Sequence, residues 1–339
     1  MSVTIRDVAR HASVSISTVS RVLNDTCPVK EDKKRLVLDA ARELGYTPNP
    51  AALSLLSKRT GGLGVLLPFV SGEFFSELLS GLDQAAQDHD VFLVVSTSHQ
   101  RPAEFQKAIR FLDKRVDGLI VMAPDLDRDG MSLLLKTRTP LVFLNTYAEG
   151  LSADVFNFDN YAGAYMLTQH LLGNGHRRIA LVHGPVLAQD AQERARGYRA
   201  AMADAGVEDT ADLQFQGAYT REAGVAVADE IMAATSRPTA VVAANDYCAM
   251  GLISALRARG VAVPDDIAVG GFDGLPSAGF FSPPLTTVHV PIGEIGYRAV
   301  ARLVARLRGN HEGEPHQQHH VPVDLVPRES TAAVVDAVS

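Results

Sequence analysis

The sequence of 339 residues contains only two cysteines, Cys27 and Cys248, which lie far apart. A disulfide framework is therefore not expected, and the cysteine content fits a reducing cytoplasm. The sequence also has no run of about 18 apolar residues. Charged residues interrupt its start at Arg6, Asp7 and Arg10. We therefore expect a cytoplasmic protein with neither a transmembrane helix nor a secretory signal peptide.

The motifs of common enzyme and cofactor sites are missing as well. The sequence has no GxxxxGK[ST] phosphate-binding loop, and its GGLG stretch precedes a predicted strand instead of following it. GLPSAG has the wrong spacing for a nucleophile elbow. We therefore expect no enzyme activity and no cofactor.

Four histidines near the C-terminus raise the question of a metal site. They are His311, His316, His319 and His320. They lie in a polar connection without cysteine or carboxylate partners at metal-ligand spacing. We expect a solvated loop at this position and no bound metal.

Charge is distributed unevenly along the chain. The net charge is −7, but residues 1–60 contain ten Lys and Arg against six Asp and Glu. The remainder contains 22 and 33, so the N-terminal segment is +4 and the rest is −11. A polyanion is therefore expected to bind to the N-terminal segment alone.

The basic segment is predicted to form three short helices. The TIRD stretch starting at Thr4 matches a capping box, ASVS indicates a turn, and Ser15 can cap a second helix that ends at Asn24. The third helix, EDKKRLVLDAAREL, should end at Gly45. A small core is expected from the apolar residues at helical spacing, namely Ile5, Val8, Ala9, Val14, Val19, Val22, Leu23, Leu36, Val37, Ala40, Ala41 and Leu44.

Two short helices around a tight turn indicate a helix-turn-helix. The second helix can enter the major groove and present Ser17, Thr18 and Arg21 to bases and phosphates, since arginine can bind guanine through two hydrogen bonds. SISTVSR taken alone could also be an ordinary solvated helix face. The basic charge and the segment NPAALSLLSK that follows favour DNA binding.

The segment NPAALSLLSK, residues 49–58, is predicted to be a marginal helix. Asn49 can cap it and Pro50 fits its first position. About two turns are too short to be stable alone in water. The segment also has three leucines and no charge before Lys58, which is unusual for a helix at a domain boundary.

After residue 62 the pattern changes to β-rich runs that alternate with helices. The runs are LGVLLPF, VFLVVSTS, GLIVMAP and LVFLN, then, after a bridging FNFDN, RIALVHGP, AVVAAND and IAVGGFD. Continuous apolar strands separated by helices predict parallel sheets covered on both faces. We predict an α/β body with eight strands in two doubly wound subdomains, which would bind a ligand at the carboxyl ends of the strands.

Polar and aromatic residues follow several of these predicted strands. They are Phe74, Phe75, Asn145, Arg194, Tyr219, Asn245, Asp246 and Asp273. Amide, carboxylate and guanidinium groups with aromatic rings suit a sugar-sized ligand. Two alternatives remain open from the residues alone, because Asn or Asp at a strand end often only caps a helix and a Phe-Phe pair is usually part of a core.

The motif TIRDVARHASVSISTVSRVLN…LGYTPNPAALSL resembles the head of the LacI/GalR family of bacterial transcription regulators. The resemblance continues through residues 3–330 to VDLVPRES. It implies an all-α helix-turn-helix head and a periplasmic-binding-protein-like body. The implied divisions are a DNA-binding domain at 1–48, a hinge helix and linker at 49–60, an N-subdomain at 61–160 and 291–322, and a C-subdomain at 161–290 and 323–332.

The resemblance also assigns roles to residues. Base-reading positions correspond to Ile16, Ser17 and Arg21, phosphate contacts to Thr4, Ser15, Thr18 and Asn24, and the minor-groove leucine to Leu55. Arg194 and Asp273 match the main effector-binding positions. The other implied effector contacts are Phe74, Phe75, Asn145, Tyr219 and Asn245.

Three departures from the family pattern stand out. Ser13 replaces the usual glycine of the turn, which costs about 1 kcal/mol if this residue is left-handed. Lys30 and Lys33 stand where the family often has Ser and Thr, so a helix cap is lost; we interpret both as phosphate contacts, although a solvated face is the alternative. Ile16 can touch a thymine methyl group but donates no hydrogen bond, so base discrimination should depend on Arg21.

The resemblance implies a ligand-responsive repressor that binds a palindromic operator in double-stranded DNA as a homodimer. We favour a sugar effector bound between the subdomains. The alternatives are an activator or a corepressor-dependent, purine-type regulator that senses a nucleobase or a sugar phosphate. A sugar-binding transport protein would share the body, but it should have a signal peptide and no basic head. The C-terminal STAAVVDAVS has no leucine heptads, which favours a dimer over a tetramer.

Overall fold

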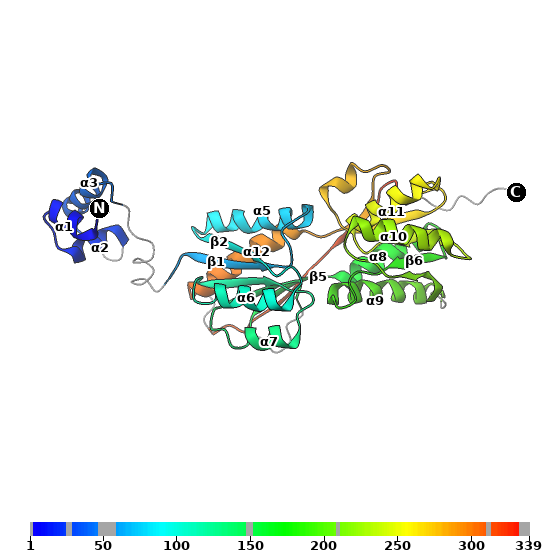
Figure 1. The fold of residues 1–339 in the computed structure, drawn as a ribbon, viewed down its shortest axis with the longest axis horizontal. Coiled ribbons are helices and arrows are strands. Elements are labelled where there is room, and N and C mark those ends of the chain that lie inside the picture. Colours follow the sequence, from blue (N-terminus) through cyan, green and yellow to red (C-terminus); the bar gives the residue numbers. More distant parts are fainter. Residues whose placement is uncertain are drawn as a thin grey trace. The chain divides into compact units, whose positions relative to one another are not determined.

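The computed structural model describes residues 3–24, 29–46, 59–146, 152–207, 211–309 and 313–331. The chain divides into a helical unit that extends to Gly62 and a larger α/β unit (Figure 1), and each is considered by itself. The predicted hinge helix with Leu55, and all but the first two residues of STAAVVDAVS, lie outside the described residues. Among the described residues, no helix is long and apolar enough to cross a membrane.

The described residues of the N-terminal unit contain three helices. They are α1 (Ile5–His11), α2 (Ile16–Asn24) and α3 (Glu31–Glu43). Their core consists of Val8, Ala9, Ala12, Val19, Val22, Val37, Ala40 and Ala41, with Ile5, Val14, Leu23 and Leu44 packed against it. The core prediction is wrong for Leu36, which is 53% exposed. Leu36 lies one position before the buried Val37 on α3, and a helix turns about 100° per residue, so both cannot point into the core.

The ends of these helices follow the capping chemistry expected from the sequence. The amide and hydroxyl of Thr4 donate to the Asp7 carboxylate at 3.0 and 2.7 Å, and the Thr18 amide donates to Ser15 Oγ at 3.2 Å. Lys30 precedes α3 and makes no side-chain cap. Ser13 has φ 52°, so the turn residue is left-handed and carries the expected strain.

The first sheet of the α/β unit has six strands. They are β1 (Gly62–Leu67), β2 (Phe92–Thr97), β3 (Gly118–Met122), β4 (Leu141–Leu144), β5 (Asp154–Phe158) and β11 (Gln318–Val321). Their order is β11-β5-β4-β3-β1-β2. The pairs from β11 to β1 are parallel, as continuous apolar strands predict.

The second sheet repeats this arrangement with one change. Its strands are β6 (Ile179–Val182), β7 (Gln214–Phe215), β8 (Ala240–Val242), β9 (Ala268–Asp273), β10 (Thr286–His289) and β12 (Asp324–Val326). Their order is β12-β10-β9-β8-β6-β7, and only the pairing of β10 with β12 is antiparallel among the described pairs. The body therefore consists of two similar α/β halves.

Helices cover both faces of each sheet (Figure 1). Beside the first sheet, α5 (Glu73–Asp88) and α12 (Ile292–Leu307) lie on one face, and α6 (Pro102–Leu112) and α7 (Arg128–Leu134) lie on the other. Beside the second sheet, α8 (Asn160–Gly173) pairs with α9 (Gln189–Asp204), and α10 (Arg221–Ala233) pairs with α11 (Asp246–Ala258). The α5–α12 contact requires glycine at position 81, because a Cβ there would stand 1.8 Å from the Gly293 carbonyl oxygen.

The strand prediction was incomplete. Instead of eight strands, the described residues contain twelve, and FNFDN is not a bridge because its first three residues belong to β5. Besides β5, the named runs omit β7 (QF), β10 (TTVH), β11 (QHHV) and β12 (DLV), each of which has at most two apolar residues and so shows no apolar run. Strand β11 also corrects the expected histidine loop, since His319 and His320 lie in it.

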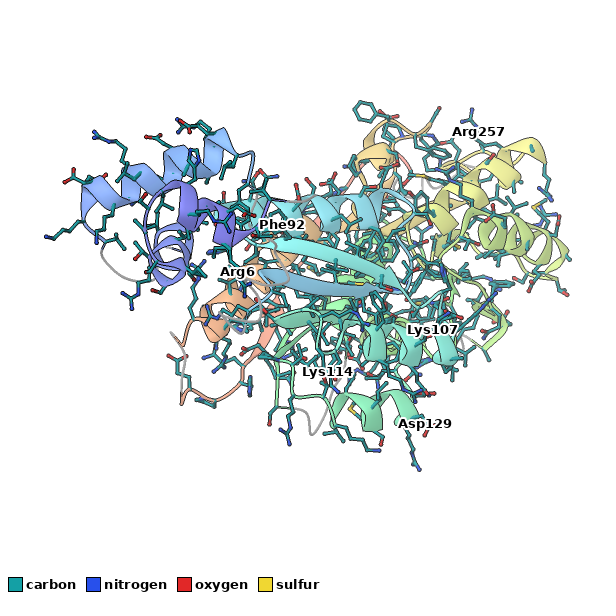
Figure 2. All side chains as sticks on the ribbon, turned by 60° about the vertical axis from the view of Figure 1, so that its left-hand side comes forward. Arg6, Phe92, Lys107, Lys114, Asp129 and Arg257 are labelled. Atoms are coloured by element: carbon teal, nitrogen blue, oxygen red, sulfur yellow. The ribbon has the colours of Figure 1, made fainter. Side chains whose placement is uncertain are left out.

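The edge strand β2 differs from the expectation that helices cover both faces. Phe92 is 75% exposed, and Val94 and Val95 on the same strand are exposed as well. Figure 2 shows the side chain of Phe92 on this strand. A strand at the end of a sheet has a neighbour on one side only, so its apolar residues remain available to a partner.

One buried carboxylate ties three segments of the first half together. Asp154, the first residue of β5, accepts two hydrogen bonds each from Arg302 and Arg306 of α12, at 2.9 to 3.2 Å. It also accepts the Gln317 amide just before β11 at 2.9 Å. Asp154 thereby fixes α12 and β11, which are the last parts of the chain to join the first sheet.

Candidate DNA-binding surface and effector cleft

Helix α2 presents a polar surface opposite its buried side. Val19 and Val22 are buried in the head, whereas Ile16, Ser17 and Arg21 are exposed. Ser17 and Arg21 are four positions apart, which places both on the same face of the helix. This face can supply an apolar contact, a hydroxyl and a guanidinium to a major groove.

The other predicted DNA contacts lie around this helix. Thr4 and Ser15 precede α1 and α2, Thr18 is half-buried in α2, and Lys30 and Lys33 are exposed at the start of α3. The side chain of Asn24, the last residue of α2, lies outside the described residues. The Ser15 hydroxyl lies 2.8 Å from both the Ser17 and the Thr18 hydroxyls, so this turn is already held by side chains.

A cavity of about 510 Å³ lies where the carboxyl ends of the two sheets face each other. All seven predicted effector residues line it, namely Phe74, Phe75, Asn145, Arg194, Tyr219, Asn245 and Asp273. The cavity is bounded by segments that directly follow β1, β3, β4, β6, β7, β8 and β9. Parallel strands with the same winding bring these ends together, as expected for doubly wound sheets.

Arg194 is the central cation of the cavity. Its guanidinium is buried and donates to Asn160 Oδ1 at 2.9 Å, to the Ala244 carbonyl at 2.7 Å and to Asp273 Oδ1 at 3.4 Å. The Phe272 ring lies 3.7 Å from the guanidinium carbon, and the Tyr219 ring lies at 5.2 Å. These contacts hold the guanidinium in one orientation, which suits a group that must bind a ligand with little reorganisation.

Asp273 ends β9 in a strained backbone conformation with φ 117°. Asn145, at the end of β4, also has a positive φ, 42°. Such strain in residues other than glycine is concentrated at ligand clamps. Asn245 Nδ2 donates to Asp273 Oδ2 at 3.2 Å, and Asn245 Oδ1 accepts the Cys248 amide and so caps α11. Asn245 is therefore both a helix cap and a residue of the cavity.

Burial dominates the electrostatics of Asp273. It raises the pKa of this carboxyl to about 6, although Arg194 and Asn245 act in the opposite direction. Asp246 lies nearby and accepts from the Thr287 hydroxyl and the Leu275 amide. Burial and the neighbouring Asp273 hold the pKa of Asp246 well above its usual range.

The sequence prediction missed Asp190. Its carboxylate accepts from Asn145 Nδ2 and from the Tyr219 hydroxyl, both at 2.9 Å, and it lines the same cavity. Asn145 belongs to the first half and Asp190 to the second, so this bond crosses the cleft. A signal was present, since Asp190 and Arg194 are four positions apart and share one face of α9.

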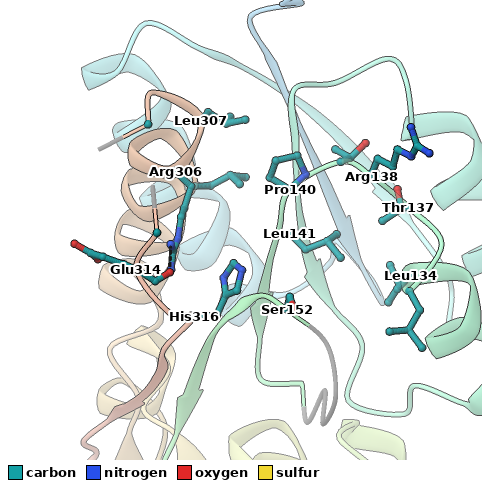
Figure 3. Close-up of a pocket in the computed structure, with 15 residues that line it drawn as sticks. Leu134, Thr137, Arg138, Pro140, Leu141, Ser152, Arg306, Leu307, Glu314 and His316 are labelled. Carbon is teal, nitrogen blue, oxygen red and sulfur yellow. Dashed lines mark hydrogen bonds between the residues drawn. The ribbon is translucent and has the colours of Figure 1, made fainter. Parts of the chain in front are cut away.

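A second hollow, of about 730 Å³, lies beside the C-terminal end of α12 and contains none of the predicted effector residues (Figure 3). Arg306 at its wall donates to the Glu314 and Pro315 carbonyls as well as to Asp154. Within the described ranges, no cluster of His, Cys, Asp or Glu can hold a metal ion. His319 stacks instead on Phe156, with ring centroids 4.3 Å apart.

An exposed recognition-type helix on a small head and a cleft between two parallel-sheet halves define a DNA-binding regulator with a ligand-binding body. Residues 4–49 match the model for bacterial regulatory proteins of the lacI family, and residues 168–331 match a periplasmic binding protein-like domain. A PurR transcriptional repressor of Photobacterium profundum is 36% identical, with 91% of this chain and 93% of that protein covered. The chain therefore belongs to the lacI family of DNA-binding transcriptional repressors and is not an enzyme.

Two solved structures extend this likeness. A lac repressor dimer bound to operator and the anti-inducer ONPF is 29% identical with a TM-score of 0.88, covering 98% of this chain and all of that one. A complex of the transcriptional regulator CelR with cellobiose is 30% identical with a TM-score of 0.73, covering 97% and 99%. The predicted architecture of a helix-turn-helix head and a two-part α/β body is thus confirmed.

Proposed function

We propose that this repressor binds a palindromic operator as a homodimer and that a small effector in the cleft switches its DNA affinity. The observation that carries the proposal is the convergence of all seven predicted effector residues, with a buried Arg194–Asp273 pair, on one cavity. A ligand that contacts both halves of the body has different affinities for different cleft openings. Such differential affinity is what an allosteric effector requires.

The likeness to a lac repressor dimer on operator supports the dimer. The exposed apolar residues of β2, together with Phe111 on α6, offer a surface that a second copy can bury. A two-fold dimer presents two recognition helices, which matches the symmetry of a palindromic site. The hinge segment 49–58 would then pair at the operator centre, with Leu55 entering the minor groove.

For the effector class, we propose a nucleobase ahead of the sugar that the residues first suggested. The support is twofold: repressors named PurR recur among the relatives, and the cavity wall is rich in aromatic rings that can stack on a flat heterocycle. A sugar is the second candidate, because the structurally similar CelR is complexed with cellobiose.

The charges of the site favour a neutral effector over a phosphorylated one. The buried charged residues at the cavity wall are Asp190, Asp273 and Arg194, and the guanidinium already donates to three acceptors. In the buried part of the cavity an anionic group would therefore meet two carboxylates against one engaged cation, while the exposed Arg221 and Glu222 at the wall have opposite charges. N–H or O–H donors of a neutral ligand would instead satisfy the carboxylate oxygens.

A thermal-shift screen of the full chain tests the effector proposal. We expect free nucleobases such as adenine and guanine to raise the melting temperature, because a ligand that binds only the folded state stabilises it. Matched nucleoside monophosphates and sugar 6-phosphates should produce no shift. If a sugar shifts the melting temperature and no nucleobase does, the effector assignment is wrong while the repressor proposal stands. A preference for phosphorylated members would contradict the charge argument.

Replacing Arg21 by alanine is expected to abolish discrimination between operator and random DNA. A bidentate arginine–guanine contact contributes about 1 to 3 kcal/mol of specificity, and Ile16 supplies no hydrogen bond to compensate. The operator is first selected from a random DNA pool with the wild-type chain, and both affinities are then measured by fluorescence anisotropy at several salt concentrations.

The matched control is Arg42→Ala, which removes the same charge from the exposed face of α3. The control should preserve the ratio between operator and random DNA. Thermal stability of the body should not change in either variant. Retained discrimination in Arg21→Ala would refute the assignment of α2 as the recognition helix.

A further inference from the structure

Glu73, the first residue of α5, makes two hydrogen bonds to the other half of the body. Its amide donates to the Tyr247 hydroxyl on α11 at 2.7 Å. Its carboxylate accepts the amide of Ser277 at 2.8 Å, within the short helix η2 (Pro276–Gly279). Helix α5 covers the first sheet, whereas α11 and η2 belong to the second half, so Glu73 spans the cleft.

The packing around Glu73 is close and specific. Gly72 has φ 91°, and a Cβ at this position would stand 3.0 Å from the Tyr247 ring, so only glycine fits here without strain. In the second half of the body, the guanidinium carbon of Arg221 lies 5.0 Å from the centroid of the Tyr247 ring. Tyr247 is thus held in the position from which its hydroxyl reaches the start of α5.

The location of this contact connects it to the ligand-binding residues. Phe74 and Phe75, which follow Glu73 directly, line the cavity, and Ser277 is four residues beyond Asp273. Glu73 itself is not among the residues that line the cavity. It therefore joins the aromatic wall on one side to the carboxylate-bearing segment on the other without occupying the ligand space.

A second set of bonds crosses the cleft on the opposite flank. The Gln189 amide donates to the Pro124 carbonyl at 3.3 Å, and Asn145 donates to Asp190. Asn145, Asp190 and Pro124 all line the cavity, so a bound molecule can compete for or rearrange these bonds. Tyr247 also lines the cavity, but Glu73 and Ser277 do not, so the bond between the Glu73 carboxylate and the Ser277 amide joins two residues outside the cavity wall.

We propose that Glu73 is a positioning residue that sets the closure of the cleft whether or not an effector is bound. Its carboxylate and amide, with Ser277 and Tyr247, form a strut that fixes the separation between Phe74–Phe75 and Asp273. When the strut is lost, the two halves separate more often, and the bonds on the far flank open with it because each half moves as a rigid sheet-and-helix body. The inference does not depend on which effector the cleft takes.

Hydrogen exchange of the full chain, without any added ligand, tests the strut. Amide exchange in native proteins reports the free energy of local opening. In Glu73→Ala we expect exchange at the Ser277 amide to accelerate at least tenfold. We also expect a several-fold acceleration at the Gln189 amide, which lies across the cavity from the substituted residue.

Three further variants distinguish a contact that controls the whole cleft from one that only stabilises its immediate surroundings. Glu73→Gln keeps an oxygen that can accept the Ser277 amide and should restore near wild-type exchange at both sites. Tyr247→Phe removes the acceptor of the Glu73 amide and should accelerate exchange at Gln189 as well. Glu77→Ala removes the same charge one turn along α5, where the side chain is exposed, and should change neither amide.

The outcomes are decisive in both directions. Acceleration at Ser277 and Gln189 together, with rescue by Glu73→Gln, supports the strut. Acceleration confined to Ser277 would mean that Glu73 only caps η2, and the proposal would be wrong. Unchanged exchange at both amides in Glu73→Ala and Tyr247→Phe would overturn it as well. Since no effector is used, none of these outcomes bears on the identity of the ligand.

Discussion

Asp154→Ala is expected to lower the free energy of unfolding of the α/β unit by about 3 to 5 kcal/mol, the usual cost of breaking a buried ion pair from one side. Asp154 is fully buried and accepts four hydrogen bonds from Arg302 and Arg306. Alanine would remove the buried carboxylate that both guanidinium groups share and the acceptor of the Gln317 amide, although Arg302 would keep Glu314 at 3.8 Å. In a unit of this size the loss corresponds to a fall in melting temperature of roughly 10 °C.

The same carboxylate should make stability depend on pH in the acid range. Hydrogen bonds from Arg306 and Arg302 hold the pKa of Asp154 well below its usual value, and they outweigh the effect of burial. A depressed folded-state pKa contributes stability above the unfolded-state value near 4, and this contribution is lost as pH falls further. The difference in melting temperature between wild type and Asp154→Ala should therefore shrink below about pH 4.

The comparison variant is Glu294→Ala, which breaks the exposed Glu294–Arg298 pair on the same helix α12. An exposed pair of this kind contributes at most about 1 kcal/mol. Circular dichroism melts of the full-length wild type, Asp154→Ala and Glu294→Ala give the three melting temperatures. Equal melting temperatures for Asp154→Ala and Glu294→Ala would show that the buried cluster contributes no more than a surface pair.

Asp273→Ala is expected to weaken effector binding by roughly 10- to 100-fold, because charge-assisted hydrogen bonds contribute about 1.5 to 3 kcal/mol. The fold should survive, since Arg194 keeps its bonds to Asn160 and to the Ala244 carbonyl. The variant should bind the operator but no longer respond to the effector found by the thermal-shift screen. Calorimetry of effector binding and anisotropy of operator binding measure the two properties separately. A preserved response would mean that the cleft has been misassigned.

A pH series adds an independent readout of Asp273. Its pKa is raised to about 6, so the carboxyl is protonated at pH 5 and ionised at pH 7. A ligand that donates to the ionised carboxylate binds more tightly as pH rises through 6. Asp273→Asn keeps the shape but cannot ionise, and its affinity should not change in this range. Arg194 and Asp190 are charged neighbours, and Asp246 is buried beside the site, so the apparent midpoint belongs to the cluster.

Much of the site could be predicted from the sequence because each strand carries its own signal. Asn145, Asn245 and Asp273 follow apolar strands, and parallel winding brings the ends of such strands to one edge. Asp190, Asn160 and Glu73 could not be found in the same way. Their importance comes from partners far along the chain, such as Ser277, which is 204 residues from Glu73.

The secondary structure also contains parts that could be predicted from the sequence and parts that could not. The head was predicted in detail, since capping residues and helical spacing are local properties. Its one wrong core residue, Leu36, reflects the short distance between buried and exposed positions on a helix. In the body, strands within apolar runs were predicted, whereas β7, β10, β11 and β12, with at most two apolar residues each, were missed because neighbouring strands stabilise their pairing.

By itself the sequence determined the class of protein: a basic helix-turn-helix head, an acidic α/β body and the polar residues at its strand ends. Periodicity, capping and charge act over a few residues and can be recognised in one dimension. Only the tertiary structure decided that Asp190 reaches Asn145, that Asp154 holds two arginines of α12 and that Glu73 crosses the cleft. Hydrogen bonds between segments far apart in the sequence form only where the two sheets bring these segments together. A pattern of neighbouring residues does not reveal which distant segments will meet.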